Sequence, residues 1–144
     1  MNVIVCIDER GAMLFNHRRV ARDKAVYADI LKTVRGERLF IKPYSEKLFL
    51  PFADEAELPT VTDDPLSVAS GGEWCFIEDE DITPYYDKIE KLLIYFWDCT
   101  YPFELKLDVS FVRANFRMSE RKKFAGAVHD AITRELYRKD FRSK

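Results

Sequence analysis

Residues 2–11 read NVIVCIDERG, an apolar run followed at once by a charged segment and a glycine. The run is short and rich in β-branched residues, which is typical of a strand buried on both faces. The charged segment at 8–11 is a turn signal. We therefore expect residues 2–7 to form a central strand of a covered sheet.

Outward from this strand, helices and strands are expected to alternate. Apolar residues recur at helical spacing over 22–34, where Arg35 and Gly36 supply a stop. Pro43 favours a short helix over 43–49. The acidic, proline-punctuated stretch at 51–64 is expected to be a surface loop. Further expected elements are strands at 38–41, 60–62, 74–77 and 92–97, and a helix at 81–91.

The C-terminal part leaves one assignment open. Alternating apolar residues at 105, 107, 109 and 111 predict a half-buried strand over 105–115. Residues 124–132 fit a helix, whereas 132–138 also fit a strand, and periodicity alone does not separate the two. The alternation of elements predicts a single domain over 1–144, in which helices flank a mixed sheet in three α/β layers. Ligands of such folds bind at the carboxyl ends of the strands.

Composition and charge narrow the classes of function. The 144 residues include 23 basic and 25 acidic side chains, a net charge of -2, so no overall field favours nucleic acid or an anionic membrane. No apolar run reaches the roughly 18 residues that a bilayer needs. The first residues also lack the pattern of a signal peptide. We therefore expect a cytoplasmic protein that binds neither nucleic acid nor membrane.

The sequence carries few signals for metal or nucleophilic chemistry. Cys6, Cys75 and Cys99 are odd in number and widely spaced in apolar stretches, so buried thiols are expected, and not disulfides or metal ligands. His129 is expected to stabilise a turn. The aromatic residues of 85–103 are expected to pack in the core. The sequence has no Gly-rich phosphate loop, nucleophile elbow or CxxC pair.

The order of the expected elements resembles that of the dihydrofolate reductase family. The likeness is sharpest at VIVCID (3–8), Gly11 and DKAVY (23–27), which resemble that family's opening strand, glycine and first helix. The segment 74–95 resembles its strand, helix and strand near the cofactor, and the tail that ends at 132–139 resembles its closing hairpin. The resemblance implies a mostly parallel central sheet. It also puts Asp23 where that family carries its catalytic carboxylate, in the first helical turn.

Three departures from that family concern its cofactor, NADPH. Its Pro-Trp pair corresponds to His17 and Arg18, so the aromatic wall beside the nicotinamide is absent. Its Gly-Gly turn corresponds to EDED at 78–81, where four carboxylates would repel a phosphate. Its basic phosphate-binding segment corresponds to KPYS at 42–45, which keeps only Lys42 as a positive charge. We therefore expect no cofactor, with NADPH reserved for the alternative that the chain is a working reductase.

A second resemblance starts from VCIDERGAMLFN at 5–16. Small bacterial proteins of unassigned function that open in this way are sometimes labelled ribonuclease Z. That activity needs a dense cluster of His and Asp to hold zinc and activate water. The chain has two histidines, His17 and His129, and no HxHxDH arrangement. The label is therefore not expected to describe its chemistry.

Asp23 and the basic residues are the candidate ligand site. Burial of Asp23 at the base of a pocket would raise its pKa and let it protonate a heterocycle. Alternatively, Asp23 is a solvated carboxylate favoured by the helix dipole. The neighbouring basic loop could clamp a carboxylate or phosphate, or be an ordinary solvated turn. The candidate ligand-binding residues are His17, Arg18, Arg19, Lys42 and Ser45.

The acidic turn is a candidate contact for a partner. Glu78, Asp79, Glu80 and Asp81 could bind a basic protein or form a solvated turn. A metal is the least expected occupant, because the calcium-loop spacing with its glycine is absent.

Two hypotheses of function follow. The leading one is a non-catalytic protein of dihydrofolate reductase-like fold that binds a protein partner or a small metabolite, because the Pro-Trp pair is lost and the glycine turn is acidic. The rival is an NADPH-dependent reductase of a pterin or related heterocycle, supported by Asp23 and the element order. Fold alone does not choose between them.

Overall fold

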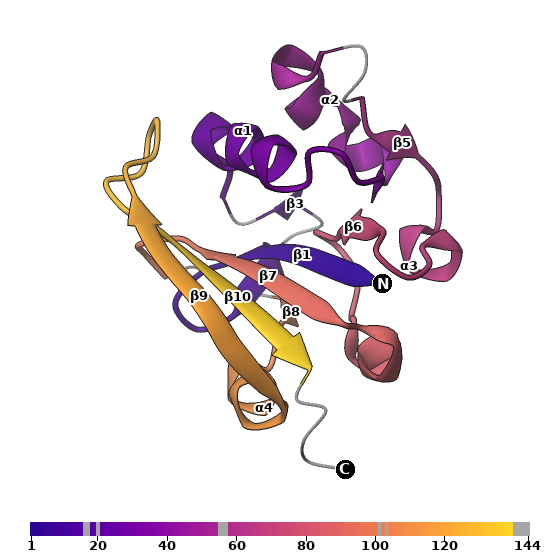
Figure 1. Cartoon of the computed structure of the whole chain (residues 1–144). Coiled ribbons are helices and arrows are strands. Elements are labelled where there is room, and N and C mark those ends of the chain that lie inside the picture. Colours follow the sequence, from indigo (N-terminus) through magenta and orange to yellow (C-terminus); the bar gives the residue numbers. More distant parts are fainter. Residues whose placement is uncertain (16–17, 20, 55–57, 101, 103, 140–144) are drawn as a thin grey trace.

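The computed structural model describes residues 1–15, 18–19, 21–54, 58–100, 102 and 104–139. A seven-stranded sheet in the order β5-β4-β6-β1-β7-β10-β9 forms its centre (Figure 1). The pairs β4–β5, β4–β6, β1–β6 and β1–β7 are parallel, whereas β10 runs antiparallel to both β7 and β9. The sheet is therefore mixed and mostly parallel, as predicted.

The strands of this sheet largely follow the apolar runs of the sequence. β1 (Asn2–Ile7) is buried at every position and lies between β6 and β7. The other strands are β4 (Leu39–Ile41), β5 (Thr60–Val61), β6 (Trp74–Phe76), β7 (Lys91–Phe96), β9 (Phe116–Phe124) and β10 (Ile132–Lys139). A smaller sheet in the order β3-β2-β8 consists of β2 (Ala12–Phe15), β3 (Arg18–Arg19) and β8 (Leu105–Lys106).

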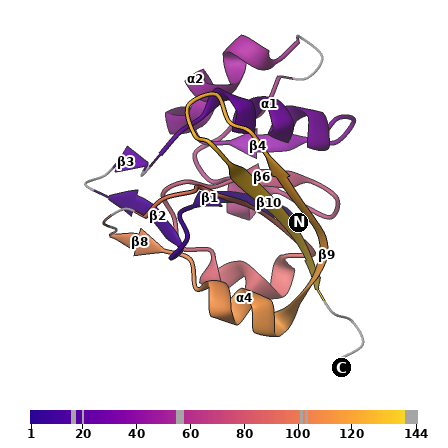
Figure 2. The same ribbon diagram turned by 90° about the vertical axis from the view of Figure 1, so that its left-hand side faces the viewer.

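Helices cover both faces of the large sheet, which gives the three predicted layers (Figure 2). One face carries α1 (Lys24–Thr33) and α2 (Glu46–Phe49), with the 3-10 helices η1 (Pro43–Ser45) and η2 (Leu50–Phe52) on either side of α2. The other face carries α3 (Pro65–Val68), the 3-10 helix η4 (Thr83–Lys88) and α4 (Val109–Asn115). None of the helices among the described residues has the length and apolar character needed to cross a membrane.

The alternation of side chains along β1 builds a separate core in each gap between layers. Val3, Val5 and Ile7 pack on the α4 side, whereas Ile4 and Cys6 pack on the α1 side. All five are less than 9% exposed. Burying each large apolar side chain contributes about 1.5–3 kcal/mol, so β1 supplies much of the stability of both layers.

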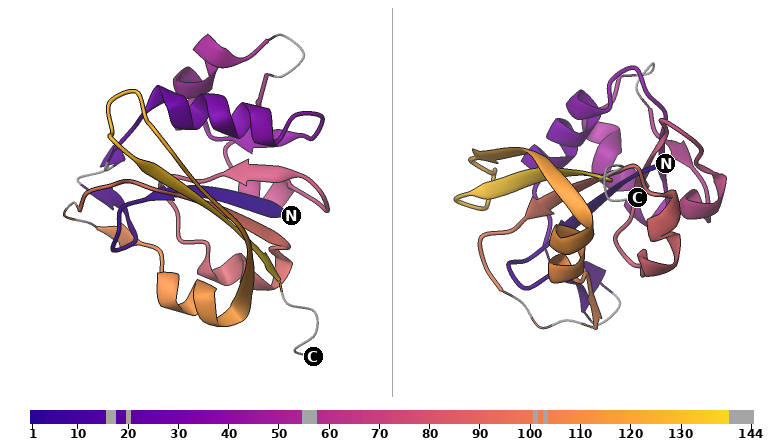
Figure 3. Two further views of the ribbon diagram at one scale, coloured as in Figure 1. Left: turned by 60° about the vertical axis from the view of Figure 1, so that its left-hand side comes forward. Right: turned by 60° about the horizontal axis from the view of Figure 1, so that its bottom comes forward.

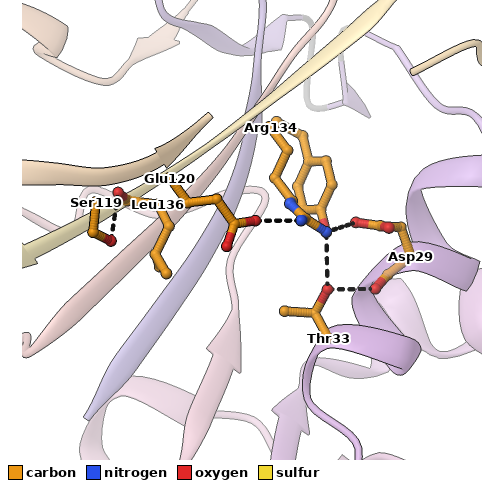
Figure 4. Close-up of polar contacts among 7 residues, drawn as sticks. Asp29, Thr33, Ser119, Glu120, Arg134 and Leu136 are labelled. Atoms are coloured by element: carbon orange, nitrogen blue, oxygen red, sulfur yellow. Dashed lines mark hydrogen bonds and ion pairs between the residues drawn. The ribbon is translucent and has the colours of Figure 1, made fainter. Parts of the chain in front are cut away.

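A partly buried arginine, Arg134, ties helix α1 to the sheet (Figure 4). The Arg134 guanidinium of β10 donates to Asp29 Oδ2 at 2.8 Å and to Thr33 Oγ1 at 3.3 Å, and it also pairs with Glu120 of β9. The hydroxyl of Tyr95 donates to the same Asp29 oxygen at 2.6 Å. These contacts fix the position of α1, and with it the elements that surround the candidate site.

The structure corrects the prediction of a strand over 105–115. Only Leu105–Lys106 is strand (β8), and the chain then forms α4. Asp108 starts this helix, because its Oδ1 accepts the N–H of Phe111 at 3.0 Å. Val112 and Phe116, four residues apart, are buried on one side of the segment. The alternation of apolar residues over 105–111 therefore predicts the wrong structure, because it does not reveal Asp108 as a helix cap.

Two other assignments change or are resolved. The helix predicted over 81–91 is the shorter 3-10 helix η4, because Ile89 is already extended and fully buried as the chain enters β7. At the C-terminal end, 132–139 is strand β10, and its hairpin with β9 has the form implied by the resemblance. The turn of this hairpin reaches toward the start of α1 (Figure 3).

Candidate functional site

The loops that follow β1, β4 and β6 meet at one edge of the sheet, because these strands are parallel. Lys42 and Ser45 follow β4, and the acidic residues 78–81 follow β6. Arg19, on β3, reaches the same edge. Arg19, Lys42 and Ser45 therefore lie together with the acidic turn at this edge.

Arg19 and Glu78 form a bidentate ion pair at this edge. Arg19 Nε donates to Glu78 Oε2 at 2.6 Å, and its terminal nitrogen donates to Oε1 at 3.0 Å. Glu78 is 5% exposed, and Ser45 Oγ also donates to its Oε1 at 2.6 Å. Burial acts to lower the pKa of Arg19, but the hydrogen bonds and charge of Glu78 outweigh it and the pKa is raised. Arg19 therefore stays charged, and two of its guanidinium nitrogens are occupied by Glu78.

Tyr44 completes the cage around Arg19. Its ring lies 4.2 Å below the guanidinium carbon, a cation–π contact. Its hydroxyl accepts the backbone N–H of Arg19 at 3.1 Å, and its carbonyl accepts from the guanidinium at 3.2 Å. Arg19 is thus held on several sides by the chain itself, which leaves little capacity to clamp an external anion.

Lys42 is neutralised in the same way. Its Nζ lies 2.9 Å from Asp79 Oδ1 and 2.9 Å from Glu80 Oε1. Burial acts to lower the pKa of Lys42, but hydrogen bonds to Glu80 and Asp79 raise it. The fourth acidic residue, Asp81, caps the start of η4 by accepting the N–H of Thr83 at 2.9 Å. Three of the four carboxylates therefore have cationic partners within the chain.

Two buried groups near the Arg19–Glu78 pair, the Cys6 thiol and the Tyr27 hydroxyl, remain uncharged. Burial, followed by the charge of Glu78, raises the pKa of the Cys6 thiol well above its ordinary value, so it remains protonated and is a poor nucleophile. Burial likewise raises the pKa of Tyr27. The Tyr27 side chain is 3% exposed, and its hydroxyl has no hydrogen-bond partner among the described residues.

Asp23 lies just before helix α1 and not in its first turn, which runs from Lys24 and contains no acidic residue. As the N-cap, its Oδ1 accepts the N–H of Ala25 at 2.9 Å. It also accepts three N–H groups from the β9–β10 turn, those of Ala127 (2.8 Å), Val128 (2.9 Å) and His129 (3.0 Å). The Asp23 side chain is a structural link between α1 and the hairpin.

The pKa of Asp23 moves in the direction opposite to the one expected for a proton donor. Burial acts to raise it, but the backbone donors from Val128, Ala127, Ala25 and His129 outweigh burial and lower the pKa. The carboxylate is therefore ionised at neutral pH. In this geometry Asp23 accepts hydrogen bonds and has no proton to give to a ligand.

A pocket of about 490 Å³ lies between α1, the α2–η2 segment and the β9–β10 turn. Its volume falls within the range of small-molecule sites, roughly 300–1,000 Å³. The lining includes Asp23, the basic residues Arg22, Lys24 and Lys47, and the apolar or aromatic residues Tyr27, Leu48, Pro51, Phe52 and Val128. The combination favours a ligand with an apolar body and a negative charge.

The remaining predicted residues and the cysteines are placed as follows. His17 lies outside the described residues, and Arg18 is exposed. Cys6 and Cys75 are buried, as predicted, whereas Cys99 is only partly buried. Sequence reasoning missed Tyr27 and Tyr44, since both fit an ordinary helix or loop pattern.

Comparison with known proteins identifies the fold class. No family model matches the chain, and no curated protein matches it either. Among solved structures, the dihydrofolate reductase of Enterococcus faecalis, in complex with NADP(H) and RAB-propyl, is similar with a TM-score of 0.62. The match covers 96% of this chain and 95% of that chain at 12% sequence identity. The protein therefore has a dihydrofolate reductase-like fold; the resemblance to proteins labelled ribonuclease Z finds no support in these matches.

Proposed function

We propose that this protein uses the dihydrofolate reductase-like fold to bind a small apolar anion, and that it is not a nicotinamide-dependent reductase. The observation that carries the proposal is the closed set of ion pairs at the sheet edge. Arg19 is paired with Glu78 at 2.6 Å, and Lys42 with Asp79 and Glu80 at 2.9 Å. A dinucleotide phosphate at this edge would have to break these pairs and then face unpaired carboxylates.

The pocket beside α1 supports the binding half of the proposal. Arg22, Lys24 and Lys47 at its lining have no anionic partner among the described residues, and the charge of Asp23 is already used by four backbone N–H groups. Tyr27 also lines this pocket, and its buried hydroxyl has no hydrogen-bond partner among the described residues, so a ligand that penetrates to it would supply the missing bond. A small metabolite is favoured over a protein partner bound at 78–81, because the charges of that turn are mostly neutralised.

Calorimetric titration with NADPH tests the catalytic half. We expect no heat of binding at micromolar protein and up to millimolar NADPH, and no oxidation of NADPH when dihydrofolate is added. Glu78→Gln with Asp79→Asn removes two of the repelling charges and is the matched variant. Micromolar NADPH binding by the unmodified protein would refute the non-catalytic proposal and support a reductase.

Fluorescence titration with 1-anilinonaphthalene-8-sulfonate, an apolar anion, tests the pocket. Lys47→Gln removes one charge near the sulfonate, worth about 1 kcal/mol or roughly a fivefold weaker Kd. Lys32→Gln, on the exposed side of α1, is the matched control and should leave the Kd unchanged. Near-UV circular dichroism shows that the protein stays native during titration. Equal affinity in both variants, or no binding by the native protein, would place the ligand elsewhere.

A further inference from the structure

The loop after β7 and the turn between β9 and β10 bring three potential metal ligands together. This group does not include the residues of the Arg19 and Lys42 ion pairs. Its members are Asp98, Cys99 and His129. One ligand atom from each, a carboxylate oxygen, the Sγ atom and a ring nitrogen, all lie within 4.8 Å of one another. Asp98 is exposed and the other two are partly buried, so the group can be reached from solvent.

The three donors match the preferences of a zinc-type ion. Zinc is bound by Cys sulfur at about 2.3 Å, His nitrogen at about 2.0–2.1 Å and carboxylate oxygen at about 2.0–2.2 Å. Tetrahedral geometry then separates the ligand atoms by roughly 3–4 Å. The atoms, which lie within 4.8 Å of one another, would therefore have to approach by roughly 1 Å to bind one ion together.

His129 is already oriented in the manner of a metal ligand. Its Nδ1 lies 3.1 Å from Asp23 Oδ2, so a proton on Nδ1 would be shared with this carboxylate, and in that tautomer Nε2 carries the lone pair that a metal needs. Its ring stacks on Trp97 with centroids 4.6 Å apart and planes at 26°. A carboxylate behind the histidine is a recurrent support for bound metals, because it fixes the ring and increases its basicity.

Of the three cysteines, Cys99 has the surroundings that a ligand needs. Cys6 and Cys75 are buried, and burial raises the pKa of both thiols, which disfavours the thiolate. Cys99 is partly buried and is not in a disulfide. Asp98 keeps one carboxylate oxygen available, since the described contact, with the N–H of Ala131 at 3.0 Å, uses Oδ2.

We propose that Asp98, Cys99 and His129 form a three-ligand site for Zn²⁺ or a similar borderline transition metal, with Asp23 as the supporting carboxylate behind the histidine. Three protein ligands leave a fourth position for water or an anion, the arrangement of an open site. Arg121 and Lys123 line the hollow next to Asp98 and lower the affinity for a cation, although Arg121 is already paired with Glu135 at 3.3 Å.

Titration of metal-free protein with Zn²⁺ by calorimetry, and with Co²⁺ by absorption, tests this site. We expect one ion per chain and a cobalt–thiolate charge-transfer band. Cys99→Ser should abolish the band and weaken Zn²⁺ binding at least tenfold, and His129→Asn should weaken it similarly. Asp130→Asn, a carboxylate next to His129 that is not a member of the group, is the control and should bind as the parent protein does.

Because two ligand variants are used, Cys99→Ser and His129→Asn, the test still gives an answer if one of them fails to fold. His129 contributes to the link with Asp23, so far-UV circular dichroism must show that its variant is native, whereas Cys99→Ser leaves that link in place. Absence of Zn²⁺ binding by the parent protein would overturn the proposal. Binding that is unchanged in Cys99→Ser, or lost in Asp130→Asn, would also overturn it and assign the ion to other residues.

Discussion

Replacing Asp23 by Asn should destabilise the protein severely, although the two side chains have the same shape. The carboxylate accepts Ala25 and Ala127 on Oδ1, and Val128 and His129 on Oδ2. An asparagine has one oxygen, so whichever way the amide turns, its NH₂ group faces two backbone N–H donors. Each buried donor left without an acceptor costs about 1–3 kcal/mol. We therefore expect the free energy of unfolding to fall by about 4 kcal/mol.

Urea unfolding followed by circular dichroism measures this loss. The midpoint should fall with little change in slope, and the midpoint temperature of thermal unfolding should fall by roughly 10 °C for a chain of this length. Asp130→Asn, an exposed neutralisation in the same turn, is the matched control and should change stability by less than about 0.5 kcal/mol. Asp23→Ser keeps the α1 cap but not the bonds to the hairpin, so it separates the two contributions.

The same effect has a definite dependence on pH. The folded pKa of Asp23 is lowered relative to an unfolded value of about 3.9. The stability that its charge contributes is therefore fully present above about pH 5, and it is lost as the pH falls below the unfolded pKa and through the folded one. The gap between parent and Asp23→Asn should narrow toward pH 2. A loss under about 1 kcal/mol at pH 7, or a gap that does not change between pH 6 and pH 2, would refute this account.

Three further changes test other parts of the structure. Glu78→Gln removes the charge that Arg19 is paired with, and leaving this partly buried guanidinium without its anionic partner should cost about 3 kcal/mol in urea unfolding; a neutral outcome would show that the ion pair is solvated. Arg134→Met strips the α1 carboxylate of its partner and should lower stability by about 3 kcal/mol, whereas Arg138→Met at an exposed position should not. Gly11→Ala should reduce the yield of folded protein, because φ is +93° there and the added Cβ would strike the Leu107 carbonyl oxygen; full thermal stability would contradict this reading.

Much of the fold is readable from the sequence because the central strands are buried on both faces. The apolar runs at 2–7 and 74–77 place β1 and β6 within one residue. The segment 105–115 misleads because apolar residues spaced by two continue into a helix whose start depends on one side chain, Asp108. A helix start that depends on one capping residue is a weaker signal in the sequence than a run of alternating apolar residues, so the alternation decided the prediction.

The candidate site is less readable, since its chemistry comes from pairs that are distant in sequence. Arg19 and Glu78 are separated by 59 residues, and each taken alone belongs to a patch of one charge. A signal was available: the loops after parallel strands share an edge, so opposite charges there are expected to meet. The link that Asp23 makes to the hairpin could not be anticipated, because three of its four backbone donors belong to a turn more than 100 residues away.

The position of β10 within the sheet governs the order in which the molecule can fold. β10 is the last strand along the described chain, yet it lies between β7 and β9 and not at an edge. During synthesis, β7 therefore has an unfilled side until 132–139 have left the ribosome, and the cap of α1 lacks its hairpin donors until 127–129 have done so. The long-range pairing of β10 with β7 must therefore wait until 132–139 are made, which predicts a late step in folding. Until then the exposed edge of β7 is a place where nascent chains can associate.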